Sequence, residues 1–269
     1  SAFTSTGVTL GSGAETNENS QPLVCWSWKA NGAGSANTDG SINTTATSAN
    51  TTAGFSIVKY TGTGSNATIG HGLGVAPKMI IVKNLTDARS WGVYHASLGA
   101  TQGIDLDGTG AAGSASSYWN DTAPTTSVFS IGTANNTGAA QTYVAYCFAE
   151  KTGFSKFGSY VGNGNTDGAF VYTGFKPAFV MLKYASPSGG VGNWGIHDSK
   201  RDVDNPVQKG LIANSTAIED SHDFMDILSN GFKLKSTSSN RNENGSTYIF
   251  MAFAEAPLVG SNNTPATAR

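Results

Sequence analysis

The chain has 269 residues, enough for one large β domain or two domains of ordinary size, and it needs no disulfide or metal to hold a core. Charged residues make up only 13% and the formal net charge is −2, so the sequence has no basic surface of the kind that binds nucleic acid or an anionic membrane. The longest apolar runs, such as MIIV at 79–82 and FVML at 179–182, have the length of strands and are too short to span a membrane.

The most informative feature of the sequence is a strand-like segment that occurs three times. We call it the closing strand because it ends each repeated unit. Residues 23–30 read LVCWSWKA, residues 143–151 read YVAYCFAEK, and residues 248–256 read YIFMAFAEA. Residues 1–30 match only the end of the repeated unit, so we expect them to be the C-terminal hairpin of an incomplete first copy. Two interpretations stay open. The sequence is a fragment of a longer polypeptide, which we favour, or the hairpin completes a sheet elsewhere, such as in a neighbouring subunit.

The rest of the chain divides into a polar stretch, two homologous units and a tail. Residues 31–52 predict a polar linker or an irregular edge strand. The homologous units at 53–151 and 152–256 are called here the first and second module. Residues 257–269 are expected to form an extended tail. The modules share identical residues 100 positions apart: Tyr60 and Tyr160, Gly62 and Gly162, Gly64 and Gly164, Gly74 and Gly174, Pro77 and Pro177, Lys83 and Lys183.

Within each module the pattern is that of β structure. Short runs rich in β-branched and aromatic residues, such as FSIVKY and MIIVK, are separated by turns rich in Gly, Asn and Ser. This pattern predicts an all-β fold of tandem antiparallel β-sandwich or jelly-roll modules of about 100 residues each. One short helix is expected at 215–228, where a Ser cap and early acidic residues precede apolar residues at helical spacing. Trp91 and Trp194 occupy equivalent strand positions and are expected in the core.

Both cysteines, Cys25 and Cys147, lie in copies of the closing strand. A disulfide between them would require equivalent strands of different modules to lie side by side. We therefore expect both to be reduced and buried as small apolar residues.

No motif predicts a catalytic residue, a metal site or a cofactor. The GxGxxG at 108–113 is not followed by a helical pattern, so a flexible loop is favoured over a dinucleotide site. NGNTDG at 163–168 lacks the acid that a calcium loop needs at its twelfth position, so a tight turn is favoured over bound calcium. The carboxylates at 198–226 could supply a glycosidase pair, but solvated loop charge is favoured. The histidines have no metal-binding spacing, and a structural role is favoured for them: His71, His95, His197 and His222.

Two segments are candidates for ligand contact. Trp119 lies in a polar loop, SSYWNDT, where a flat apolar ring beside Asn120 and Asp121 would suit a sugar. A loop anchor packed against the sandwich is the slightly favoured alternative for this tryptophan. The second candidate is the charged segment DSKRDVDNPVQKG at 198–210, whose selected contact residues are Lys200, Arg201 and Asp202.

Four long segments of the sequence resemble those of a known group of proteins. They are AGFSIVKYTGTGSNATIGHGLGVAPKMIIVKN, YVAYCFAEKTGFSKFGSY, GNGNTDGAFVYTGFKPAFVMLK and YIFMAFAEAPLVGSNNTPATAR. Together they resemble the repeated C-terminal modules of large virion proteins of marine tailed bacteriophages, such as those that infect cyanobacteria. The resemblance covers essentially the whole chain. It implies a surface-exposed structural or adhesive role on a virus particle, and it transfers no catalytic residue.

The leading hypothesis is therefore a non-enzymatic bacteriophage protein on the virion surface, outside the cell. It would be a tail-fibre or receptor-binding segment that forms a homotrimer. Its partners would be other virion proteins and host cell-surface polysaccharide, with no role for nucleic acid or membrane insertion. A capsid decoration or head-fibre structural protein, a glycan depolymerase and a non-viral secreted adhesin remain as alternatives.

Overall fold

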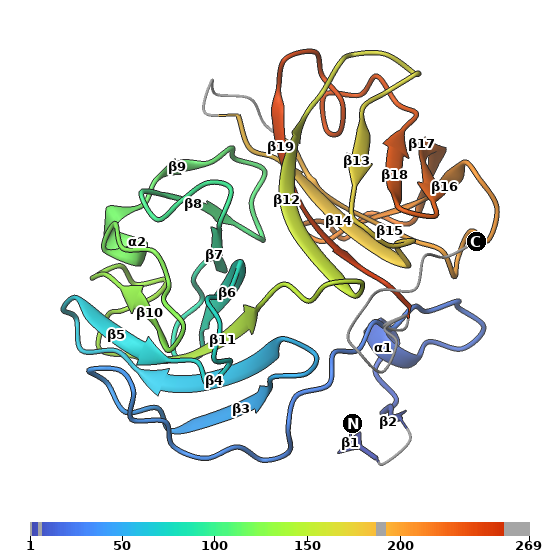
Figure 1. Ribbon diagram of the computed structural model, residues 1–269. Coiled ribbons are helices and arrows are strands. Elements are labelled where there is room, and N and C mark those ends of the chain that lie inside the picture. Colours follow the sequence, from blue (N-terminus) through green and yellow to red (C-terminus); the bar gives the residue numbers. More distant parts are fainter. Residues whose placement is uncertain (1, 5–6, 187–191, 256–269) are drawn as a thin grey trace.

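The computed structural model describes residues 2–4, 7–186 and 192–255, and its regular secondary structure is almost entirely antiparallel β strand (Figure 1). Two helices are described, α1 (Ala14–Asn17) and α2 (Ser116–Trp119), and each has only four residues. The predicted all-β fold is confirmed. No described helix has the length and apolar character needed to span a membrane.

The first large sheet has seven strands in the order β3-β4-β11-β6-β7-β8-β9. A separate two-stranded sheet, β5 (Ala67–Gly70) with β10 (Val128–Ile131), contributes Ile69 and Phe129 to the core of this half. The edge strand β3 comes from the polar stretch before the first module. The strands of the large sheet are β3 (Ala46–Asn50), β4 (Phe55–Thr61), β6 (Met79–Asn84), β7 (Gly92–His95), β8 (Gln102–Asp105), β9 (Gly113–Ser114) and β11 (Thr142–Phe148).

The second large sheet has eight strands in the order β12-β19-β14-β15-β16-β17-β18-β13. It bends so far that side chains from both ends share one core, as Tyr160 on β12 and Phe232 on β18 do at a centroid distance of 6.2 Å. Its strands are β12 (Ser155–Val161), β13 (Phe170–Tyr172), β14 (Phe179–Tyr184), β15 (Trp194–Asp198), β16 (Val207–Ile212), β17 (Asp220–Leu228), β18 (Gly231–Leu234) and β19 (Thr247–Phe253).

Repeated residues hold equivalent places in the two large sheets. Tyr60 stacks on Tyr143 at a ring-centroid distance of 5.2 Å, and Tyr160 stacks on Tyr248 at 5.1 Å. The hydroxyl groups of Tyr60 and Tyr160 each donate a hydrogen bond of 2.6 Å to a main-chain carbonyl of their own module. Gly62 is required by a close approach, since a Cβ there would lie 2.2 Å from the carbonyl oxygen of Ala139.

The helix predicted at 215–228 is wrong. Residues Asp220–Leu228 form β17, which pairs with β16 on one side and β18 on the other. Met225 and Ile227 face the second-module core, whereas Phe224 packs on His197 at 4.7 Å. Because both faces of this strand are covered, its apolar residues do not alternate simply, and the sequence pattern imitates a helix.

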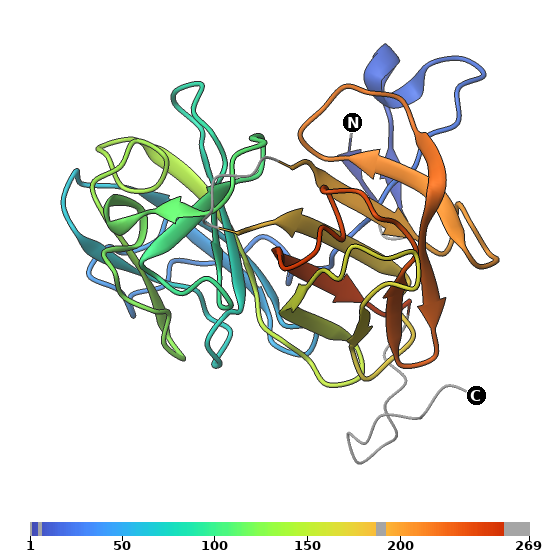
Figure 2. The ribbon, with the colours of Figure 1, turned by 90° about the horizontal axis from the view of Figure 1, so that it is seen from above.

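The two large sheets also share a core, which we call the shared core. On β11, Tyr143, Ala145 and Cys147 point into the first-module core, whereas Phe148 points toward the second sheet. The two halves therefore lie against each other through sheet faces rather than through a flexible connection (Figure 2). The buried members of the shared core are Phe55, Met79, Ile81, Val93, Ile104, Phe148, Phe157, Phe179, Met181, Ala185, Trp194, Ile196, Ile249, Met251 and Phe253.

The repeated tryptophans differ in burial. Trp194 is 1% exposed, as predicted, and its indole N–H donates to the main-chain carbonyl of Asp105 at 2.9 Å. This hydrogen bond joins the second module to the first. Trp91 is only partly buried and packs against the shared core, with the Lys83 ammonium 5.4 Å from its ring centroid.

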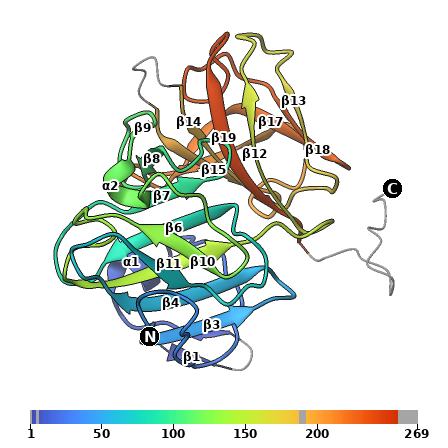
Figure 3. The same ribbon diagram turned by 60° about the vertical axis from the view of Figure 1, so that its left-hand side comes forward.

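The expected N-terminal hairpin does not form within this structure. The short strand β2 (Val8–Thr9) pairs with β1 (Ala2–Phe3), and residues 23–30 belong to no described strand. They instead run along the shared core, where Trp26 and Trp28 pack. Cys25 is exposed, contrary to the prediction, because its side chain points away from that core. Cys147 is buried as predicted, and both thiols are free. In Figure 2 the N-terminal elements, in dark blue, lie on the side of the second module, and Figure 3 shows β6, β11, β4 and β3 of the first sheet side by side.

Candidate functional site

The predicted sugar platform at Trp119 is wrong. Trp119 ends α2 and is 1% exposed, with its ring 5.9 Å from that of Tyr94 on β7. It is the loop anchor that the sequence also allowed. The neighbouring Asn120 has a left-handed backbone, with φ of 51°, and its side-chain oxygen accepts a 2.6 Å hydrogen bond from Asn66. Asp121 is exposed, but the buried Trp119 ring offers no aromatic surface next to it.

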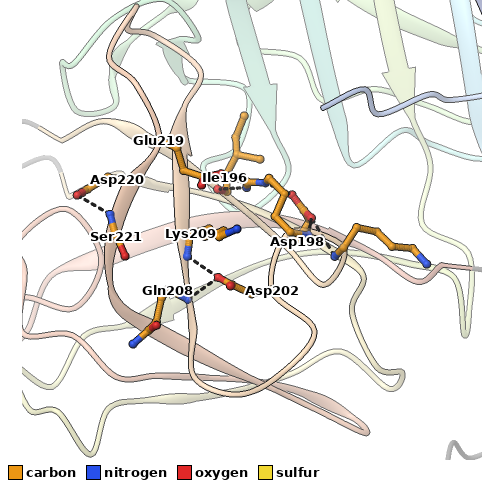
Figure 4. A network of polar contacts seen from close by, with 10 residues as sticks. Ile196, Asp198, Asp202, Gln208, Lys209, Glu219, Asp220 and Ser221 are labelled. Atoms are coloured by element: carbon orange, nitrogen blue, oxygen red, sulfur yellow. Dashed lines mark hydrogen bonds and ion pairs between the residues drawn. The ribbon is translucent and has the colours of Figure 1, made fainter. Parts of the chain in front are cut away.

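Arg201 is the structural centre of the charged segment 198–210, and Figure 4 labels three of its partners, Ile196, Asp198 and Glu219. Its Nε lies 2.7 Å from a carboxylate oxygen of Asp198, whose side chain is only 2% exposed, and an Nη lies 2.7 Å from Glu219. The guanidinium also lies 5.7 Å from the ring centroid of Trp26. Since its charge is matched by two carboxylates and its plane covers an aromatic ring, Arg201 holds the segment in place rather than offering a free cation.

Asp202 also has a local structural role. One of its carboxylate oxygens accepts hydrogen bonds from the main-chain N–H groups of Gln208 (2.7 Å) and Lys209 (2.5 Å). The side chain of Gln208 in turn donates to Asp223 at 2.7 Å. These contacts tie the loop after β15 to β16 and β17, and Figure 4 shows the two hydrogen bonds that Asp202 accepts.

Lys200 is the predicted contact residue that does face an open hollow. The hollow has a volume of about 400 Å³ and lies beside the loop that connects β15 to β16. The exposed Lys200 and Glu255 form an ion pair at its edge. Its residues are Gly153, Phe175, Lys176, Pro177, Ala178, Ser199, Lys200, Val203, Ala254 and Glu255.

The lining of this hollow combines apolar and polar groups. Phe175 and Pro177 are buried and supply apolar surface, while Val203, at 80% exposed, projects from the loop. The exposed Lys176 adds a second ammonium group to the lining. Sequence reasoning missed Phe175, Pro177 and Glu255. Repetition could have indicated two of them, since Pro177 and Glu255 recur in the first module as Pro77 and Glu150, whereas Phe175 has Val75 at the equivalent position.

A second hollow of about 240 Å³ lies under the GTGAAG loop. It is lined in part by Asp105 and Tyr118, whose side chains are 3.4 Å apart. Burial raises the pKa of Asp105, and burial together with the Asp105 charge raises the pKa of Tyr118 to about 12. The loop itself is held by Lys183, which donates to the carbonyl oxygens of Gly108 and Thr109. Residues 108–112 form a connection between β8 and β9 and no helix, which agrees with a loop rather than a dinucleotide site.

Three of the four histidines, His71, His95 and His197, are buried parts of the fold, whereas His222 is exposed. His95 is buried on β7 and accepts from the N–H of Ser97 at Nδ1, while its Nε2 lies 3.1 Å from the carbonyl of Phe250. Burial lowers its pKa to about 4 and also lowers the pKa of His71 and, more strongly, of His197. Within residues 2–4, 7–186 and 192–255, no group of three or more His, Cys, Asp or Glu side chains is placed to hold a metal ion.

The NGNTDG segment forms the turn that its sequence predicts. Asn163 accepts from the N–H of Asn165 at 3.1 Å, and Asn165 accepts from the N–H of Asp167 at 2.9 Å. These are consecutive Asx turns. Asp167 pairs with Lys233 on β18, so the acid closes the turn onto the sheet.

Comparison with known proteins places the chain in one family. Residues 1–257 match a family described as Domain of unknown function (DUF7483). The chain belongs to this family. No curated protein and no solved structure matches it. The DUF7483 match spans both large sheets together with residues 23–30, so the family unit includes the shared core as well as the two modules.

Proposed function

We propose that this DUF7483 chain is a non-enzymatic surface protein of a tailed-bacteriophage virion, and that it is a tail-fibre segment that contacts host cell-surface glycan. The observation that carries the proposal is the hollow beside the β15–β16 loop, with Phe175, Pro177 and Val203 next to Lys200 and Glu255. The resemblance of the sequence to virion modules of marine tailed bacteriophages supports the setting.

The chemistry of the hollow suits a sugar. A pyranose ring has an apolar face of C–H groups and an edge of hydroxyl groups, so it needs apolar surface next to donors and acceptors. Phe175 and Val203 offer the apolar surface, and the Lys200 and Glu255 pair offers a donor and an acceptor. Lys176 adds a charge that would favour an acidic polysaccharide.

The rigid connection between the two modules suits a protein that presents a weak glycan-binding site. Because the two large sheets share a core, the hollow is held at a fixed place relative to the first sheet. A single site of this size binds weakly, but a homotrimer would present three copies, and avidity of about 10² to 10⁴ is expected from simultaneous engagement. The other partners in this proposal are virion proteins that position the trimer on the particle.

The test is binding of the purified chain to intact marine bacterial cells, with competition by their extracted surface polysaccharide. Val203→Asp places a charge on the apolar part of the hollow and should weaken binding at least tenfold, about 1.4 kcal/mol. Ile218→Asp is the matched control, since Ile218 is 90% exposed in the same half of the molecule and does not line the hollow.

Three outcomes would overturn the proposal. Equal binding by both variants removes the hollow from the contact. Tight association with phage particles but not with cells, even for a multivalent form, indicates a capsid decoration protein. Release of reducing ends from the polysaccharide indicates a depolymerase.

A further inference from the structure

The three copies of the closing strand meet at one point in the structure. Trp28, Phe148 and Phe253 occupy the same position in the three copies. Their ring centroids are 6.1 Å apart for Trp28 and Phe148, 5.5 Å for Trp28 and Phe253, and 6.1 Å for Phe148 and Phe253. The three equivalent residues are in mutual contact, and each copy directs the same face to the shared core.

In the two complete modules the closing strand lies in the middle of a sheet. β11 pairs antiparallel with β4 on one side and β6 on the other. β19 pairs in the same way with β12 and β14. The face of each strand that does not contact the shared core is buried in the interior of its own module, as Ala145 and Phe250 are.

Residues 23–30 show the same alternation without the neighbours. Trp26, Trp28 and Ala30 pack against the shared core, whereas Cys25 and Ser27 are exposed and Leu23 is 52% exposed. Within the part of the chain that the structure describes, no main-chain N–H or C=O group of residues 22–28 has a hydrogen-bond partner. The segment therefore has the side-chain pattern of a central strand and two open hydrogen-bonding edges.

We propose that residues 23–30 are the acceptor strand of a third sheet, completed by a polypeptide that supplies two antiparallel strands of the β4 and β6 types. Main-chain hydrogen bonds along both edges would give the affinity, and burial of Leu23, Cys25 and Ser27 in a third module core would give the specificity. This interaction surface is independent of the glycan contact.

A second copy of this chain does not fit the role. β4 already lies between β3 and β11, and β6 lies between β11 and β7. In the second sheet β14 lies between β19 and β15, which leaves β12 as an edge. No folded copy can offer free strands of both types, so the partner must carry these strands unpaired or in an incomplete module of its own.

Cys25 allows the register of the complex to be tested on the unaltered chain. Cys25 corresponds to Ala145, which is opposite Val58 on β4 and Val82 on β6. The probes are two synthetic peptides, residues 53–62 with Val58→Cys and residues 77–85 with Val82→Cys, each activated as a mixed disulfide with thionitrobenzoate. The Cys25 thiolate attacks the peptide sulfur, the new disulfide forms, and thionitrobenzoate leaves and is measured by its colour.

The matched controls move the peptide cysteine by one residue, which turns it to the other face of the strand. They are Ile57→Cys and Lys59→Cys in the first peptide, and Ile81→Cys and Lys83→Cys in the second. The Val58→Cys and Val82→Cys peptides should react about tenfold faster than these controls, because directly opposed residues reach disulfide geometry. Cys147 is buried and burial raises its thiol pKa to about 12, so the reaction reports Cys25.

Two results would overturn the proposal. Equal rates for all peptides would mean that no strand register exists on residues 23–30. Rapid formation of a Cys25-linked dimer by the chain alone under air oxidation would mean that a second copy covers this surface. Cys25→Ser should abolish the reaction with every peptide and confirms the site of attack.

Discussion

The ammonium group of Lys183 on β14 lies 2.9 Å from the carbonyl oxygen of Thr109, in a loop of the first module. The same group donates to the carbonyl of Gly108 at 3.2 Å and to that of Gly192. Three carbonyl oxygens thus hold a fully buried cation where the two halves of the molecule meet. The equivalent Lys83 instead reaches the carbonyl of Arg89, within its own module.

The burial of Lys183 predicts a rise in stability with alkaline pH. Burial lowers its pKa from 10.5 to about 8, so between these values the unfolded chain binds a proton that the folded protein does not. The contribution of Lys183 to the free energy of unfolding should therefore increase from pH 8 toward pH 10, by up to ~3 kcal/mol over the full window, while the raised pKa of the Cys147 thiol acts in the opposite direction above pH 9. Urea unfolding at several pH values measures this rise.

The matched variants for this prediction are Lys183→Met and Lys59→Met. The first should remove the alkaline rise and lower stability at pH 7 by about 1–3 kcal/mol, because carbonyl groups lose their donor. Lys59 is exposed on β4, so its variant should keep the wild-type profile. If the stability of Lys183→Met still rises between pH 8 and pH 10, another titrating group is the cause of the rise.

Acidification should destabilise the protein through His95. Its pKa is lowered by burial from 6.5 to about 4, so from pH 6.5 to pH 4 the unfolded chain takes up a proton that the folded protein excludes. The contribution to the loss of stability is about 3 kcal/mol over this range. His95→Gln should flatten the acid limb of a stability profile, whereas His222→Gln, at an exposed position, should leave it unchanged.

The two equivalent tryptophans should differ in their contribution to stability. Trp194→Ala should cost about 3–5 kcal/mol, since it removes a fully buried side chain and its hydrogen bond to Asp105. Trp91→Ala should cost roughly 1 kcal/mol, because Trp91 is only partly buried. Chemical denaturation measures both, and equal losses would contradict the difference in burial.

Trp28 should stabilise the folded chain although it lies in no strand. Its ring contacts Phe148, Phe179 and Phe253, so Trp28→Ala should cost about 2–3 kcal/mol. Leu23→Ala, on the exposed face of the same segment, should cost less than about 0.5 kcal/mol. Equal and small effects would show that residues 23–30 are not docked on the shared core in solution.

The sequence predicts the fold well where repeated residues have a local physical role. Repetition marked Tyr60, Tyr160, Gly62 and the apolar strand cores, and the structure shows the stacking of the tyrosines and the close approach at Gly62 that explain it. The sequence-based prediction fails at β17. Both faces of this strand are buried, with Phe224 on one and Met225 on the other, so its apolar residues have a spacing that resembles a helix. The segments that bury both faces of a strand are distant in the sequence, so the local pattern of residues cannot show that both faces are buried.

The candidate site was predictable only in part. Lys200 was chosen because its segment is charged, and it does line the hollow, but Arg201 and Asp202 are engaged in holding the loop. Trp119 was chosen because its neighbours are polar, yet α2 turns its ring against Tyr94. The direction of a single side chain is set by one short turn of backbone, and composition does not report it.

The shared core has a consequence for how the molecule melts. Two similar modules joined by a tether would unfold one after the other, with two overlapping heat-absorption peaks. Here the loss of one module would uncover Phe148, Met251 and their neighbours on the other. The two modules should therefore unfold as one cooperative unit, and a calorimetric enthalpy equal to the van't Hoff enthalpy would be its signature.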